Sequence, residues 1–144
     1  MSGAEPGRGD GPRHRAESGR GPRLVPVRGA DGRAGWSLVA ANGRRLAAAV
    51  RGYRTDRELA SGVAELLAER AALRFVLSQR EDRQWTWTAY LPARSTRAGA
   101  GGGEPVARSA RGYLRRDQCR QSVTGFLQGV EHVQRMCRTA GNPW

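Results

Sequence analysis

Two long stretches of this chain repeat each other. The segment RLVPVRGADGRAGWSL aligns with RFVLSQREDRQWTWTA at an offset of 51 residues, which places Leu24 over Phe75 and Trp36 over Trp87. The segment RRLAAAVRGYRTDRELASGVAELL aligns with EPVARSARGYLRRDQCRQSVTGFL at an offset of 60 residues. Internal repetition predicts one folding unit present twice, so a recurring motif is interpreted first as part of that unit.

Each copy has the pattern of three strands followed by a helix. In WTWTAYL, Trp85, Trp87, Ala89 and Leu91 alternate with threonine and tyrosine, and a period of two is typical of a strand with one buried face. Asn42-Gly43 predicts a two-residue type I′ hairpin turn, which requires positive φ at both positions. The predicted strands are 24–28, 36–41 and 45–50 in the first copy, and 75–79, 85–91 and 105–110 in the second.

The helix of the first copy is predicted to begin at Thr55. Thr55 and Glu58 form a capping box, in which the hydroxyl and the carboxylate each accept a backbone N–H that lacks a helical partner. One apolar face follows at helical spacing, made of Leu59, Val63, Leu66 and Leu67. The second helix repeats this face with Cys119, Val123, Phe126, Leu127 and Val130, and can continue to Cys137. The predicted fold class is therefore α+β, with two tandem β-β-β-α repeats that form an antiparallel sheet packed against two helices.

Composition divides the chain into a tail and one domain. Residues 1–22 are rich in Gly, Pro and Arg without apolar periodicity, and are predicted to be disordered. Residues 23–144 are predicted to form a single domain, with repeat 1 at about 23–70, repeat 2 at about 74–137 and an inserted Gly-rich loop at about 92–104. No apolar run reaches the roughly 20 residues that span a bilayer, and the N-terminus lacks the apolar core of a signal peptide. We expect a cytoplasmic protein without membrane contact.

The charge of the chain is strongly basic. The net charge is +12, from 25 basic residues that are all arginine and 13 acidic ones. Arginine in place of lysine is typical of a GC-rich bacterial genome, but codon usage does not explain the excess over Asp and Glu. The tail carries only +1, so the charge belongs to the predicted domain and favours anionic partners.

The first copy resembles the repeat of the YegP-like proteins, small bacterial and archaeal domains of unknown function. The shared pattern is an aromatic residue, an Asn-Gly pair, a strand, a tyrosine and a helical glycine, here Trp36, Leu38, Ala40, Asn42, Gly43, Leu46, Tyr53, Gly62 and Val63. The second copy matches at Trp87, Val106, Ser109, Tyr113 and Val123, but lacks Asn-Gly and has Ser122 in place of the helical glycine. The resemblance implies an α+β fold of two similar units, built within one chain or by two chains, and implies no activity.

The tripeptide Arg-Gly-Tyr recurs where the third strand of each copy leads into the helix. In the structural interpretation, Gly52 and Gly112 permit the backbone angles of the corner, and Tyr53 and Tyr113 bury their rings between helix and sheet. The recurrence favours this interpretation. In the functional interpretation, the nearby arginines form one basic edge that contacts phosphate, with candidate residues Arg51, Arg54, Arg108, Arg111, Arg115 and Arg116.

Other motifs do not indicate a catalytic, metal or cofactor site. GAGGGEP is followed by a strand instead of a helix N-terminus, which excludes a phosphate-binding loop. Trp36 and Trp87 are expected in the core, whereas Trp85 and Trp144 can be exposed. No His, Cys or carboxylate cluster has metal-ligand spacing or the arrangement of a nucleophile and base, and a continuous helix keeps Cys119 from bridging Cys137.

The sequence leaves three function classes open. The first is a non-enzymatic protein-interaction or structural module, as a monomer with internal pseudo-symmetry or as a homodimer with an unidentified protein partner. The second is nucleic-acid binding through the basic edge, with little sequence preference. An enzyme with an unfamiliar site is the third, and no cofactor is expected.

Overall fold

The computed structural model describes residues 21–92 and 103–144. The predicted disordered tail lies outside them except for its last two residues, and most of the predicted Gly-rich loop also lies outside. Among the described residues the fold is α+β. The elements are β2 (Arg23–Arg28), β3 (Ala34–Val39), β4 (Arg45–Ala49), α2 (Asp56–Ala68), a short 3-10 helix η1 (Arg70–Ala72), β5 (Arg74–Gln79), β6 (Trp85–Leu91), β7 (Glu104–Ser109) and α3 (Arg116–Ala140).

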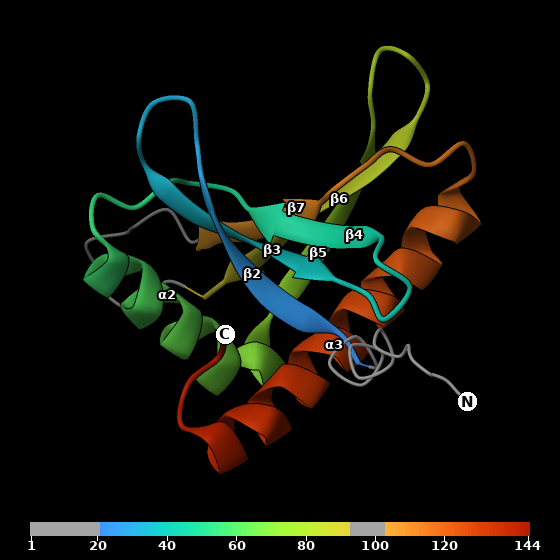
Figure 1. The fold of residues 1–144 in the computed structure, drawn as a ribbon. Coiled ribbons are helices and arrows are strands. Elements are labelled where there is room, and N and C mark those ends of the chain that lie inside the picture. Colours follow the sequence, from blue (N-terminus) through green and yellow to red (C-terminus); the bar gives the residue numbers. More distant parts are fainter. Residues whose placement is uncertain (1–20, 93–102) are drawn as a thin grey trace, which may run out of the picture.

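The six strands form one antiparallel sheet in the order β2-β3-β4-β7-β6-β5. Both helices cover the same face of this sheet (Figure 1). The two central strands are β4 and β7, which pair Ala47 with Ser109 and Ala49 with Ala107. The order of the strands is therefore symmetric about the β4–β7 pair.

The core lies between the sheet and the two helices. Trp36 and Trp87 are buried there, as predicted, together with the four apolar residues expected on the first helix, Leu59, Val63, Leu66 and Leu67. In β6 the alternation holds, since Trp87, Ala89 and Leu91 are buried. Trp85 is half-buried and packs against the core, and Trp144 is 44% exposed.

The second helix confirms most of its predicted face and contradicts one position. Cys119, Phe126 and Val130 are buried, but Leu127 is 38% exposed. In α3 the contact surface follows Phe126, Gly129, Val130 and Val133, and Leu127 falls just beyond it. The helix runs past Cys137, and both cysteines are free. Neither described helix carries an apolar stretch of the length that crossing a bilayer requires.

The cap of α2 differs from the predicted capping box in one bond. The Thr55 hydroxyl accepts the backbone N–H of Glu58 at 3.1 Å, as expected. The Glu58 carboxylate accepts the N–H of Arg54, one residue before the cap, also at 3.1 Å. The prediction placed this second bond on Thr55 itself.

The predicted type I′ turn at Asn42-Gly43 is wrong. Gly43 has a positive φ of 87°, but Asn42 does not have a positive φ. The Gly43 N–H bonds to Ala40 O at 2.9 Å and the Ala40 N–H bonds to Arg44 O at 2.8 Å, the pattern of a longer loop with a left-handed residue at its end. The Asn42 side chain accepts the N–H of Arg44 at 2.9 Å, which stabilises the non-left-handed conformation of Asn42.

The same turn occurs in the other two described hairpins. Asp31 and Asp82 each accept the N–H of the residue two positions later, at 3.0 Å. The left-handed position is Gly32 in the first hairpin, with φ 82°, but Arg83 in the third, with φ 71°. Arg83 is therefore the one described non-glycine residue that takes a conformation suited to glycine.

Replacing Arg83 with glycine is expected to stabilise the fold by roughly 1 kcal/mol, because the left-handed conformation costs a non-glycine residue about 1–2 kcal/mol and glycine's extra freedom when unfolded offsets part of the gain. Thermal denaturation should show a midpoint roughly 4 °C higher. Gly32→Ala is the matched control and should destabilise, since a Cβ there meets no atom within 4 Å and only the backbone angle opposes it. Equal midpoints for wild type and both variants would contradict the assigned turn.

Candidate functional site

The two Arg-Gly-Tyr motifs occupy equivalent positions at the ends of β4 and β7. Tyr53 forms an isolated bridge with Ala34, with both backbone N–H···O distances 2.8 Å, and Tyr113 forms the same bridge with Trp85. The Arg51 guanidinium lies 5.4 Å from the centroid of the Tyr53 ring, and that of Arg111 lies 5.0 Å from the Tyr113 ring. Each tyrosine thus ties the chain to the neighbouring strand just before the helix.

The glycines of the motif serve close packing. Neither Gly52 nor Gly112 has a positive φ, so the expectation that they permit unusual backbone angles is wrong. A Cβ on Gly52 would come within 2.6 Å of the Arg33 Cβ, and a Cβ on Gly112 would collide with the Gln84 side chain. In both places the backbone lies against a side chain of the neighbouring hairpin, which would have to move to admit a Cβ.

The candidate arginines do not form one edge. Because β4 and β7 are antiparallel, the connection that follows β4 and the one that follows β7 leave the sheet at opposite ends (Figure 1). We call residues 50–55, together with Arg33, Glu58, Glu65 and Glu104, the first corner. We call residues 110–120, together with Arg44 and Arg45, the second corner. Arg51 and Arg54 belong to the first corner, and Arg111, Arg115 and Arg116 to the second. Arg108 lies between them, exposed on β7.

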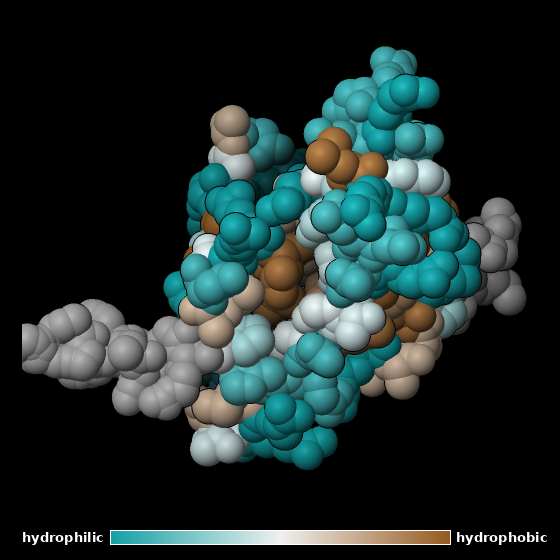
Figure 2. Space-filling model, turned by 90° about the vertical axis from the view of Figure 1, so that its right-hand side faces the viewer, coloured by the Kyte–Doolittle hydropathy of each residue, from teal (hydrophilic) through white to brown (hydrophobic). Residues whose placement is uncertain are grey.

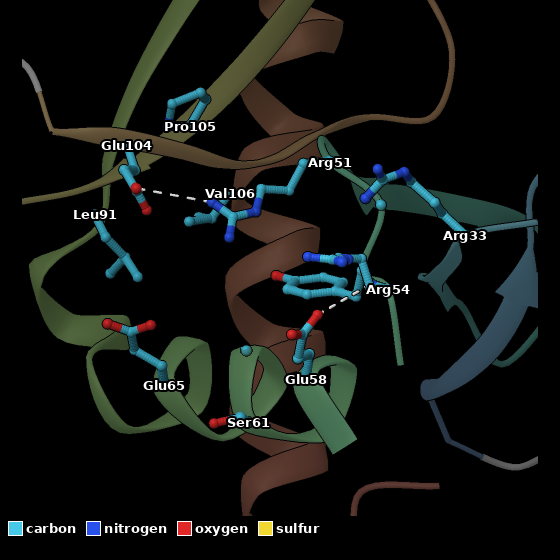
Figure 3. A pocket seen from close by; sticks show the side chains of 13 residues that line it. Arg33, Arg51, Arg54, Glu58, Ser61, Glu65, Leu91, Glu104, Pro105 and Val106 are labelled. Carbon is cyan, nitrogen blue, oxygen red and sulfur yellow. Dashed lines mark hydrogen bonds and ion pairs between the residues drawn. The ribbon is translucent and has the colours of Figure 1, made fainter. Parts of the chain in front are cut away.

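The first corner contains a pocket of about 570 Å³ whose arginines face carboxylates. Its charged lining residues are Arg33, Arg51, Arg54, Glu58, Glu65 and Glu104. Figure 3 shows them coming from the turn between β2 and β3, from the loop after β4, from α2 and from the start of β7. The Arg51 guanidinium lies 3.8 Å from the Glu104 carboxylate. Positive and negative charges are therefore balanced within this corner.

Tyr53 also lines this pocket. Burial raises the pKa of its hydroxyl, and the Arg51 guanidinium offsets part of that increase. The hydroxyl is neutral at ordinary pH, because an undisturbed tyrosine already titrates near 10. Its oxygen lies close to Gly62, where a Cβ would come within 2.5 Å of it. Tyr53 thus packs on α2 and adds no charge to the corner.

The second corner has the same backbone arrangement as the first, but it lacks glutamates at the three positions where the first corner has them. At the offset of 60, the positions of Glu58, Glu65 and Glu104 are taken by Gln118, Gly125 and Arg44. The β4–β7 register, continued by the Ala110 N–H bond to Leu46 O at 3.2 Å, brings Arg45 level with Arg111. The arginines of this corner are Arg44, Arg45, Arg111, Arg115, Arg116 and Arg120, and the acidic residue in the same segment is Asp117.

These six arginines lack carboxylate partners. Within residues 21–92 and 103–144, none of them forms an ion pair. Two of them cover aromatic rings instead, Arg111 on Tyr113 and Arg116 at 5.7 Å from the ring centroid of Trp85. Figure 2 views the molecule from the side on which the β7–α3 connection lies, and hydrophilic residues cover most of that face. The second corner thus gathers six arginines that have no carboxylate partner among the described residues.

The N-terminus of α3 adds to the positive potential there. Its N-cap is Arg115, whose side chain has no acceptor atom, whereas α2 begins with Thr55 and has two acidic residues in its first turn. The amides of a helix N-terminus carry a partial positive charge that a capping oxygen or an acidic residue would offset. At α3 less of this partial positive charge is neutralised, because the acidic residue of its first turn is Asp117.

Sequence reasoning named Arg111, Arg115 and Arg116 but missed Arg44, Arg45 and Arg120. The signal was available in the alignment, because Arg44 lies over Glu104 and Gln118 over Glu58. The alignment became informative only with the sheet order, in which each corner combines the end of one central strand with the start of the other. Among the described residues no group of three or more His, Cys, Asp and Glu is arranged to hold a metal ion.

No family model and no curated protein matches this sequence. Two solved structures share its fold. One is YegP from E. coli, a protein of unknown function, with a TM-score of 0.54 and 11% identity over 76% of this chain and 86% of the other. The second is a UPF0339 protein from Shewanella oneidensis, with a TM-score of 0.54 and 9% identity over 76% of this chain and 84% of the other. The chain therefore has the YegP-like fold that the sequence resemblance predicts, and YegP itself has no known function.

Proposed function

We propose that the protein is a non-enzymatic binding protein that contacts the phosphate backbone of nucleic acid through the second corner. The observation that carries this proposal is the contrast between two equivalent corners. At the first, three arginines line a pocket with three glutamates, whereas at the second six arginines accompany a single aspartate. A surface used only for folding has no reason to concentrate like charge, because such residues repel each other.

The chemistry of the second corner suits phosphate. Arginine presents a rigid fork of donors that matches phosphate oxygens, and helix N-terminal amides add further donors. The rings of Trp85 and Tyr113, each covered by an arginine, hold two of the guanidinium groups in position. Contacts of this kind fix the position of a nucleic acid and carry no base readout, so we expect little sequence preference.

We further propose that residues 23–144 form one domain made of two copies of a single β-β-β-α unit. Support comes from structural features that occur at corresponding positions of the two aligned segments. The Tyr53 and Tyr113 bridges correspond, as do the arginines over those rings and the aspartate-capped turns at Asp31 and Asp82.

The test is fluorescence anisotropy of labelled DNA and RNA, single-stranded and double-stranded, over a salt series. We expect the logarithm of affinity to fall linearly with the logarithm of salt concentration, by about 0.9 per phosphate neutralised on duplex DNA and about 0.7 on single strands. The double variant Arg111→Glu, Arg115→Glu should weaken binding at least ~100-fold, because each lost charge-assisted contact costs about 1.5–3 kcal/mol.

The matched control is Arg54→Glu at the first corner combined with Arg57→Glu beside it. It changes the net charge equally and alters residues that are also exposed. We expect it to retain most of the affinity of the wild type. If both pairs weaken binding alike, the attraction is a property of total charge and not of the second corner. If the wild type does not bind at low salt, the proposal is wrong and a protein partner becomes the better explanation.

A further inference from the structure

The face of the sheet that the helices leave uncovered carries a groove of about 560 Å³. Its floor is formed by small and β-branched residues of β2, β3 and β4, among them Val27, Gly35, Ser37 and Ala48. Four arginines line it, Arg33, Arg45, Arg51 and Arg108, and the acidic residue in the lining is Asp31. Arg45 belongs also to the second corner, whereas Arg33 and Arg51 belong to the first, so the groove runs between the two corners.

The four arginines differ in whether a carboxylate lies within ion-pair distance of them. Arg33 lies 4.0 Å from the Asp31 carboxylate and Arg51 lies 3.8 Å from that of Glu104. Arg45 and Arg108 have no carboxylate within ion-pair distance among the described residues. Arg108 is exposed near the middle of the sheet, where β7 pairs it with Ala48 on one side and Thr88 on the other. An exposed cation amid small and β-branched side chains is available to an anionic ligand.

A buried hydroxyl in the same groove has no hydrogen-bond partner within residues 21–92 and 103–144. Ser37 is 3% exposed, lines the groove and pairs across the sheet with Ala48, and its side chain makes no hydrogen bond to any described residue. Buried hydroxyls in proteins are nearly always satisfied, so an unpaired one calls for an explanation. The other buried serine, Ser109, accepts the backbone N–H of Trp87 at 3.2 Å. Ser37 is thus the exception among the two buried polar side chains of the described residues.

We propose that this groove binds single-stranded nucleic acid, with phosphate on Arg45 and Arg108 and a hydrogen bond from the strand to the Ser37 hydroxyl. The inference rests on the proposed function and adds the class of nucleic acid. A duplex presents its phosphates on a convex cylinder and cannot bring a polar atom down to a side chain that is only 3% exposed. A single strand can, because it is thin and its bases and phosphates turn independently.

The experiment measures anisotropy of a labelled short single strand and of a duplex of the same length, at one moderate salt concentration, with wild type, Arg108→Ala and Ser37→Ala. Arg108→Ala installs the residue that the first copy has at the equivalent position, Ala48, so the sheet accommodates it. We expect Arg108→Ala to lose about 10-fold in affinity for the single strand, the equivalent of one hydrogen bond to a charged group, and Ser37→Ala to lose about 5-fold, the equivalent of one neutral hydrogen bond. Both should lose less than about 2-fold for the duplex, which the second corner alone would hold.

Ser109→Ala is the matched control for Ser37→Ala. It removes the other buried hydroxyl, together with a hydrogen bond that the fold uses. We expect it to lower the thermal midpoint without changing the preference for single strands. Ser37→Ala should leave the midpoint unchanged or raise it while lowering single-strand affinity, an opposite pattern that a purely structural serine would not produce.

The outcomes separate the inference from the proposed function. If neither strand form binds the wild type, the proposed function fails and the inference fails with it. If both forms bind, and Arg108→Ala and Ser37→Ala leave the single-strand affinity unchanged, the second corner binds nucleic acid and the groove does not. An equal loss for both strand forms would show that Arg108 acts through general charge, which also overturns the inference.

Discussion

Trp87→Ala is expected to destabilise the protein by about 3–5 kcal/mol, the range for removing a large aromatic side chain from a packed core. Trp87 is fully buried and meets Phe75 at 5.4 Å between ring centroids, at 70° between the planes, and Phe126 at 5.0 Å. Its indole N–H also donates to the Ser122 hydroxyl at 2.7 Å. The substitution thus removes the centre of an aromatic cluster and leaves a polar group on α3 without its donor.

The measurement is the free energy of unfolding from urea denaturation. A loss of this size is a large part of the roughly 5–15 kcal/mol that stabilises an ordinary domain. Trp144→Ala is the control, since that side chain is 44% exposed and surface changes usually stay within about 0.5 kcal/mol. Trp87→Phe should fall between the two, because a ring remains while the bond to Ser122 is lost. A loss below about 1 kcal/mol for Trp87→Ala would contradict the described core.

Arg44→Glu combined with Gln118→Glu is expected to abolish most nucleic-acid binding while leaving every other arginine of the second corner in place. The two changes install glutamates at the positions equivalent to Glu104 and Glu58 of the first corner. By analogy with the Arg51–Glu104 pair, the new carboxylate at position 44 should engage Arg111. The new carboxylate at position 118 should keep the helix cap, because it can accept the Arg115 N–H as the Gln118 amide oxygen does now.

The expected loss of affinity is at least ~100-fold at moderate salt, since one phosphate contact is removed and the neighbouring arginines gain competing internal partners. The control is Arg57→Glu combined with Gln128→Glu, two exposed helix positions that change the net charge by the same amount. Circular dichroism should show both variants folded. Unchanged affinity in the first variant would mean that the absence of acidic residues at the second corner has no functional role.

Part of the fold could be predicted from the sequence. The alternation in β6, the Thr55 cap and the apolar face of α2 were predicted correctly because they depend on residues only a few positions apart, whose relation the backbone geometry dictates. The hairpin turn at Asn42 was not, because the same Asn-Gly pair suits two loops. A side-chain hydrogen bond to Arg44 selects the longer one. Leu127 was placed in the core by periodicity alone, although a helix contacts the sheet along a narrower line than its apolar residues suggest.

The sequence by itself determined the strands and helices of each segment and most of the residues that enter the core, with Leu127 as an exception, since these follow from local periodicity. The tertiary structure decided which charged side chains lie next to each other. The prediction of one basic edge assumed that equivalent corners lie together, but antiparallel pairing of β4 with β7 sends them to opposite ends of the sheet. The same pairing sets Glu104 beside Arg51 and brings Arg45 level with Arg111, so only the assembled sheet distinguishes a neutral corner from a basic one.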